Sequence, residues 1–157
     1  MAFDIKFAEN SLTPKQCDEL IIHLIQFSDK APADLNYNTL TRVRVTDHEV
    51  VKHLAKTYNL SYSKAFVMHY PSGIGSPLHV DNYSIENKVE VTHSWKESVI
   101  VFLNENFDGG ELIYPNQGLT IKPRTGNMLI APADLSSPHF VKPASSDRYV
   151  LVLRINN

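Results

Sequence analysis

Short runs of β-forming residues, separated by turn signals, fill the chain after Asn59, and this alternation constrains the fold more than any other feature. The runs are rich in β-branched and aromatic residues, and they cover residues 65–70, 89–94, 98–103, 111–114, 119–122, 127–131, 139–142 and 148–155. The segments between them include P-S-G-I-G, D-G-G, P-N-Q-G and P-R-T-G, whose glycines and prolines favour turns. Many short strands at this spacing predict an antiparallel sandwich or barrel.

The residues before this region predict two helices and two short strands. Thr13 is a candidate N-cap and Pro14 suits the first helical position. The apolar stripe of this helix consists of Leu20, Ile21, Leu24, Ile25 and Phe27. A second helix is expected after the cap Asp47, with Val50, Val51, Leu54 and Tyr58 on its apolar side. With strands at 3–9 and 41–45, the fold class is α+β, mainly β, in one domain of residues 1–157.

Composition narrows the class of protein. A hydrophobic content of 43% and a charged content of 20% are typical of a globular protein, and 157 residues suit a single domain. The net charge of -2 gives no sign of a nucleic-acid partner. Cys17 is the single cysteine, so no internal disulfide is possible, and no apolar stretch is long enough to span a membrane. We expect a cytoplasmic protein whose oligomeric state is open.

Three residues form a candidate metal site. In an extended strand, His79 and Asp81 of H-V-D would project from the same face. His139, in an apolar context near the C-terminus, would supply a second imidazole from another strand. Two imidazoles and one carboxylate on one face of a metal favour non-haem Fe(II). The H-x-D triplet alone also fits a polar strand end beside a turn.

Arginines offer candidate anion sites. Arg148 follows His139 by nine residues, and two adjacent antiparallel strands joined by a turn would bring both side chains into one interior. An inward arginine needs an anion, and its planar fork suits a carboxylate. The alternative is an exposed arginine at a strand edge. Arg42 and Arg44 share one face of the strand at 41–45, which is either solvated or faces an anionic substrate.

Four segments together resemble a known family. H79-V-D81, F102-L-N-E-N-F-D-G-G-E-L-I-Y-P, H139-F-V-K-P and D147-R-Y-V-L are similar to the Fe(II)- and 2-oxoglutarate-dependent dioxygenases, in particular to their prolyl 4-hydroxylase-like branch. The resemblance implies a double-stranded β-helix, or jelly roll, braced by the two N-terminal helices. It implies that His79, Asp81 and His139 bind iron.

The same resemblance implies a cosubstrate pocket. Arg148 would bind the distal carboxylate of 2-oxoglutarate, and Tyr70 and Ser98 would lie in the same pocket. Phe102 is a departure, because relatives commonly carry tyrosine there. The phenol that often assists the arginine is missing, so Arg148 would depend on Ser98 or on water.

The implied reaction is hydroxylation of an unactivated C–H bond by O2, with 2-oxoglutarate as cosubstrate and ascorbate as an optional reductant. No catalytic side chain beyond the metal centre is expected. The substrate is a prolyl residue of a protein or peptide, or a small molecule, with Tyr83, Trp95 and Arg42 as candidate contacts. Two alternatives stay open: a cupin-type metal hydrolase or isomerase, and a non-enzymatic jelly-roll binding module.

Overall fold

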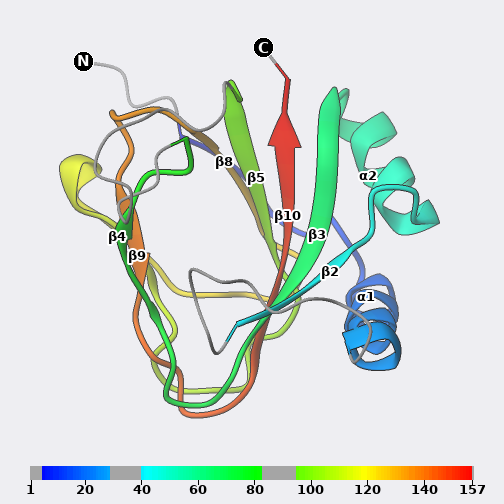
Figure 1. The fold of residues 1–157 in the computed structure, drawn as a ribbon, viewed down its shortest axis with the longest axis horizontal. Coiled ribbons are helices and arrows are strands. Elements are labelled where there is room, and N and C mark those ends of the chain that lie inside the picture. Colours follow the sequence, from blue (N-terminus) through cyan, green and yellow to red (C-terminus); the bar gives the residue numbers. More distant parts are fainter. Residues whose placement is uncertain (1–4, 29–39, 83–94, 157) are drawn as a thin grey trace.

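The computed structural model describes residues 5–28, 40–82 and 95–156. Within these residues the chain is mainly β, with two α-helices near its N-terminus (Figure 1). The elements are β1 Lys6–Ala8, α1 Pro14–Phe27, β2 Thr41–Arg44, α2 Glu49–Tyr58, β3 Tyr62–Tyr70, β4 Ser76–His79, β5 Glu97–Phe102, β6 Leu112–Tyr114, the 3-10 helix η2 Pro115–Gln117, β7 Leu119–Ile121, β8 Met128–Pro132, β9 His139–Val141 and β10 Arg148–Ile155. The run predicted at 89–94 lies outside the described residues.

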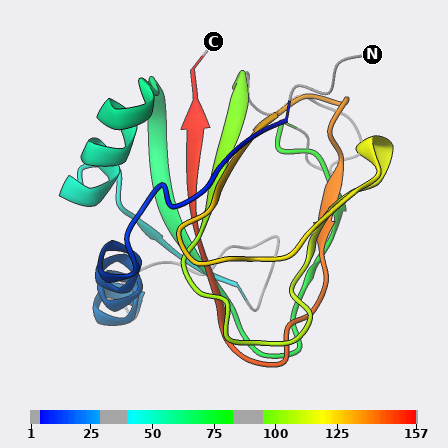
Figure 2. The ribbon, with the colours of Figure 1, turned by 180° about the vertical axis from the view of Figure 1, so that it is seen from behind.

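The strands form two antiparallel sheets, as the sequence predicts. The larger sheet has six strands in the order β1-β8-β5-β10-β3-β2, and the smaller has four in the order β4-β9-β6-β7. Figures 1 and 2 show the sheets facing each other, with α1 and α2 on the outer side of the larger one. The molecule therefore has three layers, and the space between the two sheets is enclosed on both sides.

The two helices begin where local hydrogen bonds can satisfy their first backbone N–H groups. Thr13 caps α1 as predicted, and the Gln16 side chain accepts from the Thr13 backbone N–H in return. The prediction of Asp47 as the cap of α2 is wrong. His48 occupies that position, and its Nδ1 accepts from the backbone N–H of Val50. The imidazole nitrogen of His48 accepts a hydrogen bond from the first turn of the helix, the role that the prediction gave to the Asp47 carboxylate.

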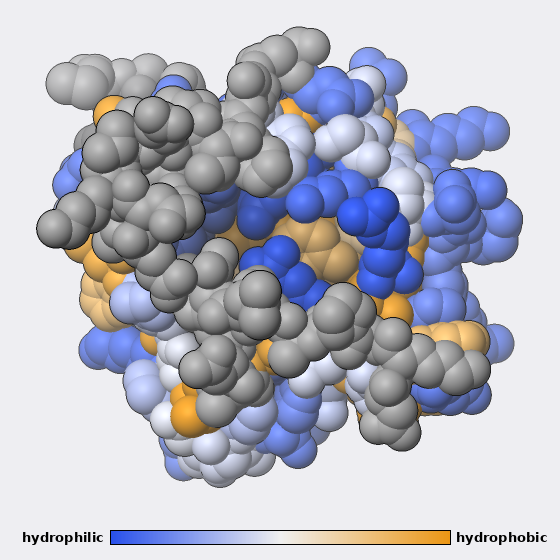
Figure 3. Space-filling model, in the orientation of Figure 1, coloured by the Kyte–Doolittle hydropathy of each residue, from blue (hydrophilic) through white to orange (hydrophobic). Residues whose placement is uncertain are grey.

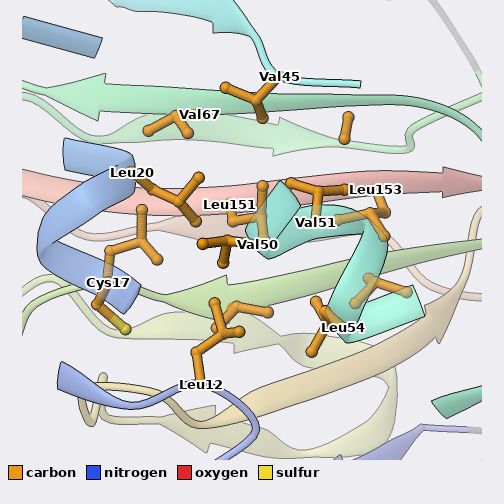
Figure 4. Close-up of a cluster of buried hydrophobic side chains, with 14 of the residues drawn as sticks. Leu12, Cys17, Leu20, Val45, Val50, Val51, Leu54, Val67, Leu151 and Leu153 are labelled. Atoms are coloured by element: carbon orange, nitrogen blue, oxygen red, sulfur yellow. The ribbon is translucent and has the colours of Figure 1, made fainter. Parts of the chain in front are cut away.

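An apolar cluster joins the helices to the outer face of the larger sheet (Figure 4). Its members include Leu12, Cys17, Leu20, Val45, Val50, Val51, Leu54, Val67, Leu151 and Leu153. The predicted stripe of α1 is only partly buried, since Ile25 remains 57% exposed and Phe27 40%. A helix lying on a sheet buries a narrower face than five apolar residues provide. No helix in the described residues has the length and hydropathy needed to cross a membrane.

A second apolar cluster fills the space between the sheets. It consists of Ile5, Leu40, Phe66, Met68, Tyr70, Ile100, Phe102, Leu112, Tyr114, Leu129, Ala131, Val141, Val150 and Val152. Because strand side chains alternate, Arg148 and Arg154 share the face of β10 that carries Val150 and Val152. Both arginines therefore belong to the face that looks into the space between the sheets.

The relation predicted between His139 and Arg148 is wrong in detail. We expected them on adjacent strands of one hairpin, but β9 belongs to the smaller sheet and β10 to the larger. The chain crosses from one sheet to the other in the residues between these strands. His139 and Arg148 thus reach the same interior from opposite sheets.

Candidate metal centre

Three ligand-type side chains converge at the end of β4. His79 and His139 are register partners on β4 and β9, and Asp81 lies just past the end of β4. Asp81 Oδ1 is 3.7 Å from His79 Nε2 and 3.5 Å from His139 Nε2. The three donor atoms lie within 4.8 Å of one another, and among the described residues no other such cluster of three His, Cys, Asp or Glu side chains occurs. The predicted convergence is confirmed as geometry.

Backbone carbonyls fix the orientation of both imidazoles. His79 Nδ1 lies 2.8 Å from the carbonyl oxygen of Pro77, and His139 Nδ1 lies 3.0 Å from that of Ser137. A carbonyl oxygen can only accept, so each Nδ1 carries a proton, and in the neutral imidazole each Nε2 presents its lone pair. The two Nε2 atoms are the ones that face Asp81. This is the arrangement that a metal-binding histidine needs.

Electrostatics favour an ionised Asp81 and a neutral His79, the charge states in which both bind a cation. Burial, and after it the neighbouring His139, lower the pKa of His79 to about 4. Burial alone would raise the pKa of Asp81, but Arg154 and then His139 hold it well below its usual value. Burial would lower the pKa of His139, yet Asp81 outweighs this and raises it. An ionised carboxylate therefore meets at least one neutral imidazole.

Arg148 is a buried cation at the start of β10, in the space between the two sheets. Its side chain is 1% exposed, and its Nε donates to the carbonyl oxygen of Gly110 at 3.0 Å. Its Cζ lies 4.8 Å from the ring centroid of Tyr70 and 5.8 Å from that of Phe102. Within the described residues no carboxylate forms an ion pair with it. Burial lowers the pKa of Arg148, and the opposing effects of Tyr70 and then of the Glu111 carboxylate do not offset it.

The D-G-G turn delivers the carbonyl that holds Arg148. Gly110 has a φ of 74°, and a side chain there would meet the Phe107 ring at 2.6 Å. Gly109 has a φ of 76°, and a side chain there would collide with the backbone oxygen of Pro143. The glycines that the sequence identifies as a turn are thus required to place the Gly110 carbonyl against the guanidinium.

Tyr70 links the arginine to the metal cluster. Burial raises the pKa of its phenol, Arg148 and more weakly Arg42 lower it, and Asp81 raises it. Tyr70 is therefore close enough to feel the charges of both Arg148 and Asp81. The buried hydroxyl of Ser76 is nearby and lowers the pKa of the Tyr70 phenol more than Arg42 does. Tyr70 is buried between the metal cluster and Arg148, and its role toward a cosubstrate stays a prediction.

Ser98 lies beside a different arginine from the one predicted. It is the register partner of Arg154, and its hydroxyl accepts from Arg154 Nη1 at 2.6 Å. Arg148 is six residues away along β10, about 20 Å at the usual rise of a strand. The expectation that Ser98 assists Arg148 is therefore wrong, although Ser98 is close to Asp81 through Arg154.

Two of the predicted substrate contacts, Arg42 and Trp95, lie within the described residues, and both are partly buried. Arg42 stacks over the Phe66 ring at 4.6 Å. The Trp95 ring lies 4.8 Å from Lys64 Nζ, and the Asn82 amide donates to the Trp95 carbonyl oxygen at 2.9 Å. Tyr83 lies outside the described residues. Figure 3 shows a recess near the middle of this face, with hydrophilic residues around a more hydrophobic floor.

Two residues of the site were not predicted. Arg154 binds Asp81, with Nη1 2.9 Å from Oδ2. Tyr114 stacks on His139 with ring centroids 4.9 Å apart, and burial raises the pKa of its phenol. Arg148 and Arg154 are separated by an even number of residues in an otherwise apolar strand. This spacing places both side chains on one face of the strand, so it could have predicted Arg154 as a second inward arginine. Nothing in the sequence distinguishes Tyr114 from an ordinary core tyrosine.

Comparisons with known proteins agree with this geometry. A family model described as the 2OG-Fe(II) oxygenase superfamily matches residues 65–155. Prolyl 3-hydroxylase 2 of Mus musculus is 30% identical over a stretch that covers 44% of this chain but only 12% of that protein. The chain therefore matches a small part of this relative.

Solved structures extend the likeness to nearly the whole chain. A viral collagen prolyl hydroxylase from Paramecium bursaria Chlorella virus-1, in complex with 2-oxoglutarate, has a TM-score of 0.76 at 16% identity, covering 96% of this chain and 94% of that one. A prolyl hydroxylase from Trichoplax adhaerens, in complex with a peptide of the hypoxia inducible factor oxygen degradation domain, has a TM-score of 0.73 at 21% identity, covering 97% and 83%. At these identities the matches show a shared fold.

Proposed function

We propose, since the chain belongs to the 2OG-Fe(II) oxygenase superfamily, that it is an Fe(II)- and 2-oxoglutarate-dependent dioxygenase that hydroxylates an unactivated C–H bond. We also propose that residues 1–157 form one domain and that its two sheets are a double-stranded β-helix. The observation that carries the function is the pairing of two features in one interior. A His-Asp-His cluster and a buried guanidinium, which forms no ion pair with a carboxylate of the described residues, both lie near Tyr70.

The residues fit the metal and the cosubstrate. Nitrogen and oxygen donors from His79, Asp81 and His139 are a set that suits Fe(II) and leaves positions for further ligands. A dianion with one end at the metal would bring its other carboxylate to Arg148, whose charge has no counter-ion among the described residues. Tyr70 and Phe102 would form the apolar walls of that pocket.

The overall reaction consumes one O2 for each hydroxylation. One oxygen atom enters the C–H bond to give the alcohol, and the other enters 2-oxoglutarate, which loses CO2 and becomes succinate. Iron supplies the activation of O2, which no side chain of the described residues provides. The chain contributes ligands of fixed orientation, a cation for the cosubstrate, and burial that excludes water. Ascorbate would serve to return oxidised iron to Fe(II).

We propose a prolyl residue of a protein or peptide as the substrate. The mouse relative and both structural matches are prolyl hydroxylases, and one of them is bound to a peptide. Arg42 and Trp95 are the candidate contacts within the described residues, and Tyr83 is a candidate outside them. A small molecule with an accessible C–H bond is the alternative substrate.

Succinate release tests the proposal. The protein with Fe(II), 2-oxoglutarate and O2 should release succinate, even without substrate, through slow uncoupled turnover. Zn(II) in place of Fe(II) should give none, whereas a cupin-type hydrolase or isomerase would release no succinate with either metal. Peptides that contain proline should raise the rate and gain the mass of one oxygen atom. Failure to bind 2-oxoglutarate in the presence of Fe(II) would exclude this function and favour a binding module.

A further inference from the structure

Arg154 forms an ion pair with the carboxylate of the metal cluster and is itself almost buried. Its Nη1 lies 2.9 Å from Asp81 Oδ2, and the exposed fractions of the two side chains are 11% and 7%. The same Nη1 donates to Ser98 Oγ at 2.6 Å. The pair is therefore shielded from water and anchored to the neighbouring strand β5.

The two oxygens of Asp81 have different neighbours. Oδ1 faces the Nε2 atoms of His79 and His139, at 3.7 and 3.5 Å. Oδ2 is the oxygen that binds Arg154, at 2.9 Å from Nη1. We propose that Arg154 is a positioning residue that restricts Asp81 to a single oxygen, Oδ1, in metal binding. This inference rests on the metal centre proposed above.

The surroundings of Arg154 keep its guanidinium in place. Its Cζ lies 5.0 Å from the ring centroid of Trp95 and 5.5 Å from that of Phe66. Trp95 is held in turn by Asn82, the residue directly after Asp81, through hydrogen bonds to its backbone. The ion pair and the aromatic walls are thus built as one unit, which leaves little freedom for the Asp81 carboxylate to rotate.

Stability alone does not explain this arrangement. The Nε of Arg154 is buried and has no hydrogen-bond partner among the described residues. A buried donor without an acceptor is destabilising. An arginine placed here only to hold the fold would be expected to satisfy that donor. The interaction that distinguishes this position is the one with Asp81 Oδ2.

The number of free metal positions depends on how Asp81 binds. An octahedral ion with two imidazoles and one carboxylate oxygen keeps three positions. If both carboxylate oxygens were bound, two would remain. A chelating cosubstrate needs two positions and O2 needs one, so only the single-oxygen mode leaves room for both. Arg154 would thereby protect the position that O2 requires.

Water relaxation with Mn(II) as the probe tests this role without turnover. Mn(II) accepts the same ligands, and the relaxivity of its bound form scales with the number of exchangeable waters. Wild type should hold three waters. Arg154→Met frees Asp81 Oδ2 to bind as well, so the relaxivity of bound Mn(II) should fall by about one third. Arg154→Lys keeps a cation near Oδ2 and should restore most of the wild-type value.

Controls distinguish failure of the positioning role of Arg154 from failure of the proposed metal centre. Arg124→Met removes an arginine whose side chain is 62% exposed and paired with Glu105, and it should leave the relaxivity unchanged. If Arg154→Met does not fold, Arg154→Gln carries the same expectation, because its amide is two bonds shorter. A wild type that binds no Mn(II) overturns the metal centre itself. A wild type that binds Mn(II), with equal relaxivity in the folded Arg154 variants, overturns the positioning role alone.

Discussion

Replacing Arg148 with methionine tests the buried cation of the site most directly. The change removes the charge and keeps an unbranched apolar chain between Tyr70 and Phe102. Loss of one partner from a buried charge pair costs about 2 kcal/mol or more, and each 1.4 kcal/mol is about tenfold in affinity. The KM for 2-oxoglutarate should therefore rise by at least about 30-fold, while kcat at saturating 2-oxoglutarate changes less. Succinate release measured against 2-oxoglutarate concentration gives both constants.

The same variant should bind 2-oxoglutarate more weakly but lose no stability. Without ligand, Arg148 is a buried charge with one hydrogen bond, to Gly110, and no carboxylate partner among the described residues. Replacing a buried ion by a well-packed apolar side chain is often neutral or stabilising. The Tm of the ligand-free variant should equal or exceed that of wild type. Adding 2-oxoglutarate with Mn(II) should raise the Tm of wild type and have a much smaller effect on the variant.

The two measurements together distinguish a cosubstrate role from a structural one. Arg124→Met, at an exposed ion pair, is the matched control and should change neither the KM nor the ligand-induced rise in Tm. If Arg148→Met lowered the Tm of the free protein and left the half-saturation by 2-oxoglutarate unchanged, the arginine would serve the fold. The argument from an uncompensated buried charge would then be refuted.

Three further changes address other parts of the chain. Asp81→Asn keeps an acceptor for Arg154 but removes the charge at the metal, so Fe(II)-dependent succinate release should fall by more than about 100-fold with an unchanged CD spectrum; normal turnover would refute the ligand assignment. Phe102→Tyr adds a phenol near Arg148, and one more hydrogen bond of about 1 kcal/mol should lower the KM for 2-oxoglutarate about 5-fold. Burial raises the pKa of Cys17 from 9.0 to about 11, so its contribution to the free energy of unfolding is present below pH 9 and lost by pH 11. Urea unfolding should show a loss of at most about 2 to 3 kcal/mol over that range, absent from Cys17→Ala, and identical profiles for both proteins would contradict it.

Short-range features of the fold were the predictable ones. The H-x-D spacing keeps His79 and Asp81 close together, although β4 ends at His79 and Asp81 lies beyond it rather than in the predicted extended strand. The helix that follows Thr13 was predictable from its own cap. The cap of α2 was misplaced by one residue, because Asp and His can both accept a hydrogen bond and the sequence does not say which one is positioned to do so. Local chemistry thus predicts that an element exists better than it predicts its first residue.

Long-range relations were less accessible. The sequence predicts a turn between β9 and β10. A turn within one sheet and a connection between two sheets contain the same kinds of residues, so the sequence could not show that these strands belong to different sheets. Ser98 was assigned to Arg148 by resemblance, and only the register of β5 against β10 shows that it faces Arg154. Register depends on all the strands of a sheet together, so no single segment contains it.

The two arginines of β10 show how one strand can serve both parts of a site. They lie on the same face, yet Arg154 meets a carboxylate that also faces two imidazoles, while Arg148 meets only a carbonyl and two aromatic rings. The first is neutralised within the described residues, and the second is not. Because a desolvated cation without a counter-ion is costly, the uncompensated end of the strand is where an external anion gains the most by binding. In the proposed function, the compensated end would hold the carboxylate for the metal and the uncompensated end would bind the cosubstrate, so the difference in pairing would separate the two positions.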